Sequence, residues 1–319
     1  MNANIRTAAA RHFFIVGAPR AGTTWLATAL ALHPEIHMCP IKEPHFFALP
    51  EAGDLGSRPV TDQNVWDEVA KRGSVHNGWI RDKSNYERLL RPLAGKVAAG
   101  EATAAYLHAP LAAAAISEQF PDARIIAILR EPISRAVSQL RMDVTLGRVL
   151  GSPEEILRRE LDAASQSDRA MSQYLKRSLY AAALERYIDS FGRERVLVLR
   201  FDDVRSCPER VLELVAHLLD LSPRAFPRWL VLPDNVGVEP RWPKLNYWLI
   251  RSGIKDVIRR TVTPGLMRAG KPVFYKEPQP QPLSDKLVHD LREYFEEDIR
   301  DTEHITGLDL SGWLQHALT

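Results

Sequence analysis

The feature that most constrains the fold is the stretch FFIVGAPRAGTTWL, residues 13–26. A continuous apolar run, typical of a buried strand, leads into a turn bounded by Gly17 and Gly22, and a helix-like segment follows. In such a loop, successive backbone N–H groups point at an anion held at the helix N-terminus. Thr23 and Thr24 add hydroxyl donors. The pattern predicts a phosphate-binding loop, with a tight turn that binds nothing as the alternative.

The lysine that defines the nucleoside-triphosphate version of this loop is missing. That version continues Gly-Lys-Ser/Thr, and its lysine reaches the β- and γ-phosphates. Thr23 stands at the lysine position, and the cation of the loop is Arg20, which comes earlier. We therefore expect the loop to hold one 5′-phosphate with a small anionic group attached.

Strand-like and helix-like segments alternate along the chain. Short, continuous apolar runs predict buried strands over 12–17, 96–102, 123–130 and 195–201. Helices are predicted over 23–33, 84–93, 110–119, 132–146, 154–163, 173–190, 207–219 and 283–301. This alternation, with room for crossover connections, predicts an α/β fold with a mostly parallel central sheet flanked by helices.

The segment 221–282 differs from the rest because it is rich in Pro, Trp and Arg and has weak periodicity. It predicts an irregular cover or lid over the active site, with a plain structural wrap as the alternative. Since no linker is evident, we expect a single domain over 1–319.

Composition limits the partners and the location. A net charge of +2 gives no indication of nucleic-acid binding. Only two cysteines, Cys39 and Cys207, favour a reducing compartment over a disulfide framework. No apolar run approaches the ~20 residues of a membrane helix, and the N-terminus lacks a secretory apolar region. We therefore expect no stable membrane insertion and a cytoplasmic location.

A second basic element follows the strand at 123–130. The strand ends in Arg130, and Pro132 stands where a helix begins, a position that proline tolerates. On that helix Arg135 and Ser138 share a face. Arg130 and Ser138 are placed to bind a second phosphate, through bidentate and neutral donors respectively. The alternative is a strand-capping arginine beside solvated helix residues.

These two phosphate elements resemble those of sulfotransferases that use 3′-phosphoadenosine-5′-phosphosulfate (PAPS). GAPRAGTTWL, residues 17–26, resembles their 5′-phosphosulfate loop, and LREPISRAVSQ resembles their 3′-phosphate segment, with Arg130 and Ser138 at the matching positions. KEPHFF (42–47) and GEATAAYL (100–107) resemble segments of heparan sulfate N- and 3-O-sulfotransferases and their bacterial relatives.

The resemblance implies a P-loop-like three-layer α/β fold, PAPS as the co-substrate and no required metal. It implies a donor site made of Pro19, Arg20, Ala21, Gly22, Thr23, Thr24, Trp25, Arg130 and Ser138.

Sulfuryl transfer needs a base for the acceptor proton, cations for the developing charge, and alignment. By the resemblance Glu43 is the candidate base, if partial burial lifts its pKa toward neutral. The alternative is that Glu43 only pairs with Lys42. His45 is a rival base, although a histidine in an apolar run is more often a packed core residue. Arg20 stands where many relatives carry a catalytic lysine, so it is assigned electrostatic stabilisation.

The chain departs from the heparan sulfate enzymes at Ala102, where they carry a lysine, which argues against heparan sulfate as the acceptor. Lys42 is a candidate to replace that charge. Glu101 is expected either to orient Arg20 or Lys42 or to be a plain strand-end carboxylate.

In the Pro-rich segment, Lys271 and Lys276 are candidates for contact with the 3′-phosphate, or else are solvated. Trp242, Tyr247 and Trp248 are candidates to line an acceptor groove, or else they anchor the cover.

The sequence therefore predicts sulfuryl transfer from PAPS to a hydroxyl of a saccharide or small metabolite, with an amine as the alternative acceptor group. The alternatives are a small-molecule kinase, against which Thr23 argues, and a catalytically silent nucleotide-binding protein. The acceptor and the oligomeric state are not readable from the sequence.

Overall fold

The computed structural model describes residues 11–48, 59–93, 95–165, 173–226, 239–252, 254–255, 272–277 and 282–315. The chain divides into two compact units. The first comes from 1–130 and 181–232, and the second from 131–180 and 233–319. The single domain over 1–319 and the lid over 221–282 stay predictions.

The first unit is built on a five-stranded sheet whose strands all run parallel. Its order is β2 (Ile36–Met38), β7 (Ala98–Ala102), β1 (Arg11–Gly17), β8 (Arg124–Leu129) and β9 (Val196–Arg200). The predicted α/β fold with a parallel central sheet is confirmed. The four predicted strands are present, and β2 is an additional strand that is only three residues long.

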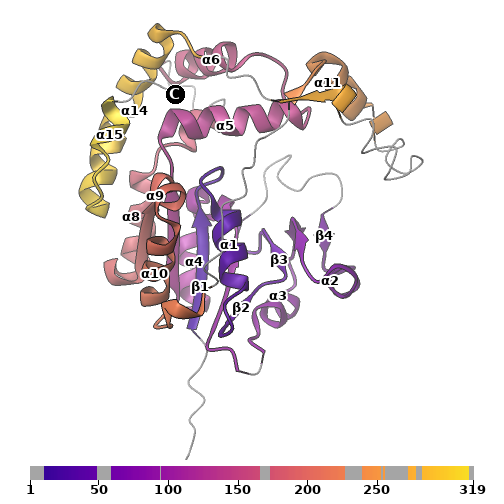
Figure 1. The fold of residues 1–319 in the computed structure, drawn as a ribbon, viewed down its shortest axis with the longest axis vertical. Helices are drawn as coiled ribbons and strands as arrows, with labels where there is room; N and C mark the ends of the chain where they lie inside the picture. Colours follow the sequence, from indigo (N-terminus) through magenta and orange to yellow (C-terminus); the bar gives the residue numbers. More distant parts are fainter. Residues whose placement is uncertain are drawn as a thin grey trace, which may run out of the picture. The chain divides into compact units, whose positions relative to one another are not determined.

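Both faces of this sheet are covered. Phe13, Phe14, Ile15 and Val16 of β1 are each 0 % exposed, and neighbouring residues of a strand point to opposite faces. The covering helices are α1 (Thr23–Ala31), α3 (Lys83–Leu90), α4 (Ala112–Gln119), α8 (Ala181–Phe191), α9 (Phe201–Ser206) and α10 (Pro208–Leu218). Figure 1 shows α1 beside β1. The sheet is therefore the middle layer of three.

The parallel sheet determines where a ligand is expected. The carboxyl ends of parallel strands lie at one edge, and ligands of such sheets bind outside that edge. The segments that leave β1, β2, β7 and β8 carry Arg20, Glu43, Thr103 and Arg130 respectively. Four chain segments that are remote in sequence thus meet at one edge.

A small lobe of the first unit follows β2. It contains two parallel strand pairs, β3 (Ile41–Lys42) with β5 (Val75–His76) and β4 (Val60–Thr61) with β6 (Gly78–Trp79), and the helix α2 (Val65–Arg72). The lobe ends at α3, where the Asp82 side chain caps the helix by accepting the N–H of Asn85 at 2.8 Å. Lys42 is the last residue of β3, and Glu43 is the next residue in the sequence.

The second unit is mainly helical. It contains α5 (Pro132–Thr145), α6 (Pro153–Ser165), α7 (Gln173–Lys176), α11 (Pro243–Arg251), α14 (Asp285–Thr306), α15 (Ser311–Gln315) and the strand pair β10 (Glu239–Pro240) and β11 (Tyr275–Lys276). Helices α5, α6 and α14 pack on one another. Helix α5 begins as expected, with Pro132 in its first turn and the Glu131 carboxylate accepting two N–H groups.

The predicted single helix over 173–190 is wrong. Helix α7 ends at Lys176 and α8 begins at Ala181. Between them Ser178 is fully buried, and its hydroxyl accepts from Nε of Arg135 at 2.6 Å and donates to the Pro132 carbonyl at 3.0 Å. Arg135 is itself 0 % exposed, so it is a core residue and not a solvated helix residue. Buried polar contacts of this kind outweigh local helix propensity.

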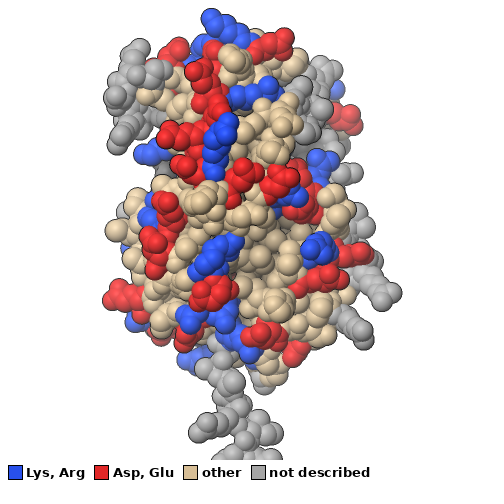
Figure 2. All heavy atoms as spheres, turned by 90° about the vertical axis from the view of Figure 1, so that its left-hand side faces the viewer, with Lys and Arg blue, Asp and Glu red and all other residues tan. Residues whose placement is uncertain are grey.

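The segment 221–282 is more regular than expected where it is described, because it contains α11 and the β10–β11 pair. Among the described helices, none combines the length and hydropathy that a membrane crossing needs. On the face shown in Figure 2, the described acidic and basic side chains are interspersed, without a continuous basic strip.

Candidate active site

The phosphate loop has the predicted form, between the end of β1 at Gly17 and the start of α1 at Thr23. Gly22 is the residue before the helix and has φ +90°, a left-handed conformation that favours glycine. A Cβ atom on Gly17 would lie 2.6 Å from Cβ of Leu107, so only glycine permits this close packing. Arg20, exposed on the loop, also has a positive φ of 69°.

The start of α1 is suited to an anion. Within the described residues no side chain caps this helix, and its first turn carries no acidic residue. The first N–H groups and the helix dipole therefore favour negative charge there. The indole Nε1–H of Trp25 is buried and has no hydrogen-bond partner among the described residues. An orphaned donor beside a helix start is what a bound phosphate group would satisfy.

Arg130, at the end of β8, is joined to this loop. Its Nη1 donates to the carbonyl oxygen of Arg20 at 3.2 Å, and its guanidinium lies 4.9 Å from the centroid of the Phe201 ring. A Cβ atom on Gly22 would lie 3.1 Å from the same ring. Phe201 therefore supports both the loop and Arg130. Phe201 was not among the predicted site residues, although it is the last residue of the strand predicted over 195–201.

Two other predicted residues belong to the second unit, and a third is not described. Ser138, half-buried on α5, belongs to the second unit, and its partnership with Arg130 stays a prediction. Lys276 is in β11 of the same unit, opposite Glu239. Lys271 lies outside the described residues.

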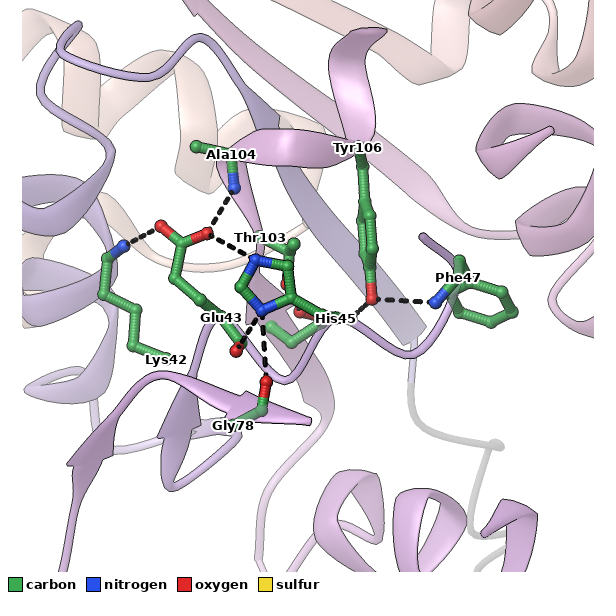
Figure 3. Close-up of polar contacts among 9 residues, drawn as sticks. Lys42, Glu43, His45, Phe47, Gly78, Thr103, Ala104 and Tyr106 are labelled. Carbon is green, nitrogen blue, oxygen red and sulfur yellow. Dashed lines mark hydrogen bonds and ion pairs between the residues drawn. The ribbon is translucent and has the colours of Figure 1, made fainter. Parts of the chain in front are cut away.

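Glu43 lies in the segment after β3, with its side chain 14 % exposed. Figure 3 shows its two carboxylate oxygens in different contacts. Oε1 is 2.5 Å from Nζ of Lys42, and Oε2 accepts the N–H of Ala104 at 3.1 Å. The pairing with Lys42, weighed as an alternative to the base role, is therefore present in the structure.

Contacts through Ala104 link Glu43 to the phosphate loop. Ala104 begins the short 3₁₀ helix η1 (Ala104–His108), which follows β7. A Cβ atom on Gly17 would lie 3.2 Å from the Ala104 carbonyl oxygen, so Ala104 packs on the first glycine of the loop. Glu43 and Gly17 thus contact the same residue from two sides.

His45 supports Glu43 from below the carboxylate (Figure 3). Its Nδ1 lies 2.8 Å from the Glu43 carbonyl oxygen and 3.1 Å from that of Gly78. Because both partners are acceptors, Nδ1 carries the hydrogen, which leaves Nε2 facing Glu43 Oε2 at 3.9 Å. The imidazole is 2 % exposed. This arrangement agrees with a packed, hydrogen-bonded histidine.

The backbone at this position is unusual. Glu43 has φ +64° and His45 has φ +53°, which residues with side chains rarely adopt. Such conformations persist where surrounding contacts impose them, and they cluster at functional sites. Here the contacts are backbone hydrogen bonds from Glu43 to the Ala102 carbonyl at 2.8 Å and from Gly78 to the Glu43 carbonyl at 2.9 Å.

The expectation that burial lifts the pKa of Glu43 toward neutral is wrong. Burial acts in that direction, but the ammonium group of Lys42 and the nearby His45 and His76 outweigh it and lower the pKa of Glu43 below its ordinary value. The carboxylate is therefore ionised, with a strong hydrogen bond to Lys42.

Glu101 has a different role from those expected. It is fully buried on β7 and accepts hydrogen bonds from the hydroxyls of Tyr86 at 2.7 Å, Thr103 at 2.6 Å and Tyr106 at 2.8 Å. Its partners are thus hydroxyl groups and neither Arg20 nor Lys42. Burial raises the pKa of Glu101 to about 7, against the opposing effect of these hydrogen bonds. Glu101 fixes the segment that carries Ala104.

Ala102 and Lys42 have adjacent backbones, because the N–H of Glu43 donates to the Ala102 carbonyl. Lys42 therefore brings a cation to the neighbourhood of Ala102, where the resembling enzymes carry a lysine.

Among the described residues, no group of three or more His, Cys, Asp or Glu side chains is arranged to hold a metal ion.

The profile of the sulfotransferase family matches residues 12–224 of the chain. Mouse carbohydrate sulfotransferase 15 is 24 % identical over 285 residues, which is 73 % of this chain and 49 % of that protein. Mouse heparan sulfate glucosamine 3-O-sulfotransferase 3B1 is 27 % identical over 210 residues, 65 % of this chain and 45 % of that protein. The chain thus spans about half the length of the curated relatives it matches.

Among solved structures, a sulfotransferase from Alicyclobacillus acidocaldarius is similar to the whole chain. The TM-score is 0.65 at 28 % identity, and the match covers 97 % of this chain and 100 % of that chain.

Proposed function

The chain belongs to the sulfotransferase family, and from this premise we propose that it moves a sulfuryl group from PAPS to a hydroxyl group of a saccharide, with Glu43 as the general base. The observation that carries the proposal is the contact of Ala104 with both Gly17 and Glu43. It brings the candidate base to the loop that suits the donor's phosphosulfate.

The donor fits the residues at the loop. Among the described residues, no side chain caps the start of α1 and none pairs with the Nε1–H of Trp25; both features, with the left-handed Gly22, suit the 5′-phosphate. Thr23 in place of a lysine suits a donor without a β/γ-phosphate pair. Arg130, held beside the loop by the Arg20 carbonyl, is proposed to bind the 3′-phosphate together with Ser138.

In the proposed reaction, the oxygen of the acceptor hydroxyl forms a bond to sulfur, and Glu43 accepts the proton of that hydroxyl. The bond between sulfur and the bridging phosphate oxygen breaks, and adenosine 3′,5′-bisphosphate leaves. Arg20 stabilises the negative charge that develops on the bridging oxygen. The low pKa of Glu43 suits late proton transfer, because the hydroxyl becomes acidic as the new bond forms.

The names of the relatives support the proposed acceptor class. Two of them are named as a carbohydrate sulfotransferase and a 3-O-sulfotransferase, which supports a saccharide hydroxyl over an amine. A cytoplasmic location is proposed as well, and it agrees with the unpaired thiols of Cys39 and Cys207.

Ligand-dependent thermal unfolding tests the donor assignment. We expect adenosine 3′,5′-bisphosphate to raise the melting temperature and ATP with Mg²⁺ to have no comparable effect, because a ligand stabilises the state that binds it. A shift with ATP and Mg²⁺ alone would favour the kinase alternative. Incubation with PAPS and a saccharide panel, followed by mass spectrometry, then tests transfer. Bisphosphate binding without transfer to any acceptor would favour a silent nucleotide-binding protein.

A further inference from the structure

In the Lys42–Glu43 pair, each of the two carboxylate oxygens of the candidate base already accepts a hydrogen bond. Oε2 of Glu43 accepts the Ala104 N–H at 3.1 Å and faces Nε2 of His45 at 3.9 Å. Oε1 is covered by Nζ of Lys42 at 2.5 Å. An acceptor hydroxyl needs one of these oxygens within hydrogen-bond distance. Since Oε2 is held by a backbone N–H group, Oε1 is the oxygen at which an acceptor hydroxyl competes only with a side chain, that of Lys42.

A second basic side chain lies next to Lys42 and has no role in the reaction described above. His76 is the register partner of Lys42 in the parallel pair β3–β5, and paired residues of adjacent strands project from the same face. The imidazole is exposed, whereas the Lys42 side chain is 16 % exposed. Burial and the Lys42 ammonium lower the pKa of His76, in agreement with their proximity.

The fold fixes the position of His76 against the pair. The N–H of Asn77 donates to the Lys42 carbonyl at 2.9 Å, and the N–H of Gly78 donates to the Glu43 carbonyl at 2.9 Å. A Cβ atom on Gly78 would lie 2.8 Å from Cγ2 of Ile41, so the two chain segments approach as closely as glycine allows. The three side chains of Lys42, Glu43 and His76 therefore form a preorganised cluster.

We propose that Lys42 and His76 form a subsite for an anionic group of the acceptor, and that its binding draws Lys42 from Glu43 and so releases the base. This inference rests on the proposed sulfuryl transfer. An acceptor carboxylate or sulfate competes with Glu43 for the ammonium group and also gains the imidazole. Loss of the Lys42 contact removes the largest effect that lowers the pKa of Glu43, which makes Glu43 a stronger base. A neutral acceptor has no group that displaces Lys42.

The test compares kcat/KM for an oligosaccharide containing uronic acid, its carboxyl-reduced counterpart and a sulfated form of that counterpart. The enzymes are the wild type, Lys42→Gln, His76→Gln and the control Lys83→Gln. Lys83 is an exposed residue of α3 whose ammonium lies 3.8 Å from the Glu87 carboxylate, a long surface ion pair.

In the wild type and Lys83→Gln we expect a preference of about tenfold or more for an anionic acceptor over the neutral one, as one charge-assisted hydrogen bond provides. The two anionic acceptors separate recognition of a carboxylate from recognition of a sulfate. His76→Gln is expected to reduce the preference through KM. Lys42→Gln is expected to remove it and to raise kcat on the neutral acceptor, because Oε1 is then free.

Equal kcat/KM on charged and neutral acceptors in the wild type, or a preference unchanged in Lys42→Gln, would overturn the inference while leaving sulfuryl transfer intact. Failure of the wild type to transfer to any acceptor would overturn the proposed function, and this inference with it.

Discussion

The guanidinium of Arg130 donates a hydrogen bond to the backbone carbonyl of Arg20 at 3.2 Å across 110 positions of sequence. It joins the two elements that the sequence identified separately as phosphate sites. A substitution at Arg130 therefore removes a cation and also the hydrogen bond that supports the phosphate loop.

Replacing Arg130 by Ala is expected to weaken binding of adenosine 3′,5′-bisphosphate about 10- to 100-fold, as loss of a charge-assisted phosphate contact does. Isothermal titration calorimetry with the bisphosphate and with adenosine 5′-monophosphate checks this. The monophosphate lacks the 3′-phosphate, so its smaller loss in affinity reports only the loosened loop. Equal losses for the two ligands would argue that Arg130 does not bind the 3′-phosphate.

Gly22→Ala tests the shape of the loop. The substitution places a Cβ atom at φ +90° and 3.1 Å from Phe201. The matched control is Gly307→Ala, which has a similar left-handed backbone (φ +68°, ψ +14°) and no atom within 4 Å of the added group. Gly22→Ala should lower the free energy of unfolding by about 1 kcal/mol more than the control, because it adds steric overlap to the same backbone strain. Urea denaturation measures the free energy of unfolding of both variants, and equal decreases would contradict the packing of Gly22 on Phe201.

Glu101 gives a pH dependence of stability. Its pKa is raised by burial to about 7 in the folded protein, against 4.5 for the ordinary group. Between these values the folded state binds more protons than the unfolded state, so this residue makes stability fall as pH rises.

Glu101→Gln removes that titration and keeps a neutral amide among the three hydroxyls. The free energy of unfolding of Glu101→Gln relative to wild type should therefore increase by about 2–3 kcal/mol from pH 4.5 to pH 7.5. Denaturation at several pH values measures the difference, in which the other titrating groups cancel. A difference independent of pH would mean that Glu101 is ionised throughout.

The sequence indicated the sheet and the phosphate loop because both depend on local patterns. The run of apolar residues before Gly17 predicts a buried strand, and two glycines at the turn predict the anion cradle. Strand β2 was not predicted, because a segment of three residues is too short to show a hydrophobic period. The break between α7 and α8 depends on the burial of Ser178 against Arg135, a contact between segments 43 positions apart.

The protonation states and side-chain partners of the site residues were harder to predict. Glu43 was identified, but the direction of its pKa shift depends on the position of the Lys42 ammonium, which adjacency in sequence does not determine. The hydroxyl partners of Glu101 come from α3, from the segment after β7 and from η1, so no spacing indicates them. Phe201 is recognisable only from its contacts with Arg130 and Gly22.

The most direct test of the account combines two measurements on Glu43→Gln. With PAPS and an accepted saccharide, kcat should fall by about 10²- to 10⁴-fold, the contribution of a general base. Affinity for adenosine 3′,5′-bisphosphate should match that of the wild type and of Glu87→Gln, a control on the exposed face of α3. Sulfate transfer by Glu43→Gln at the wild-type rate would contradict the central claim that this carboxylate takes the acceptor proton.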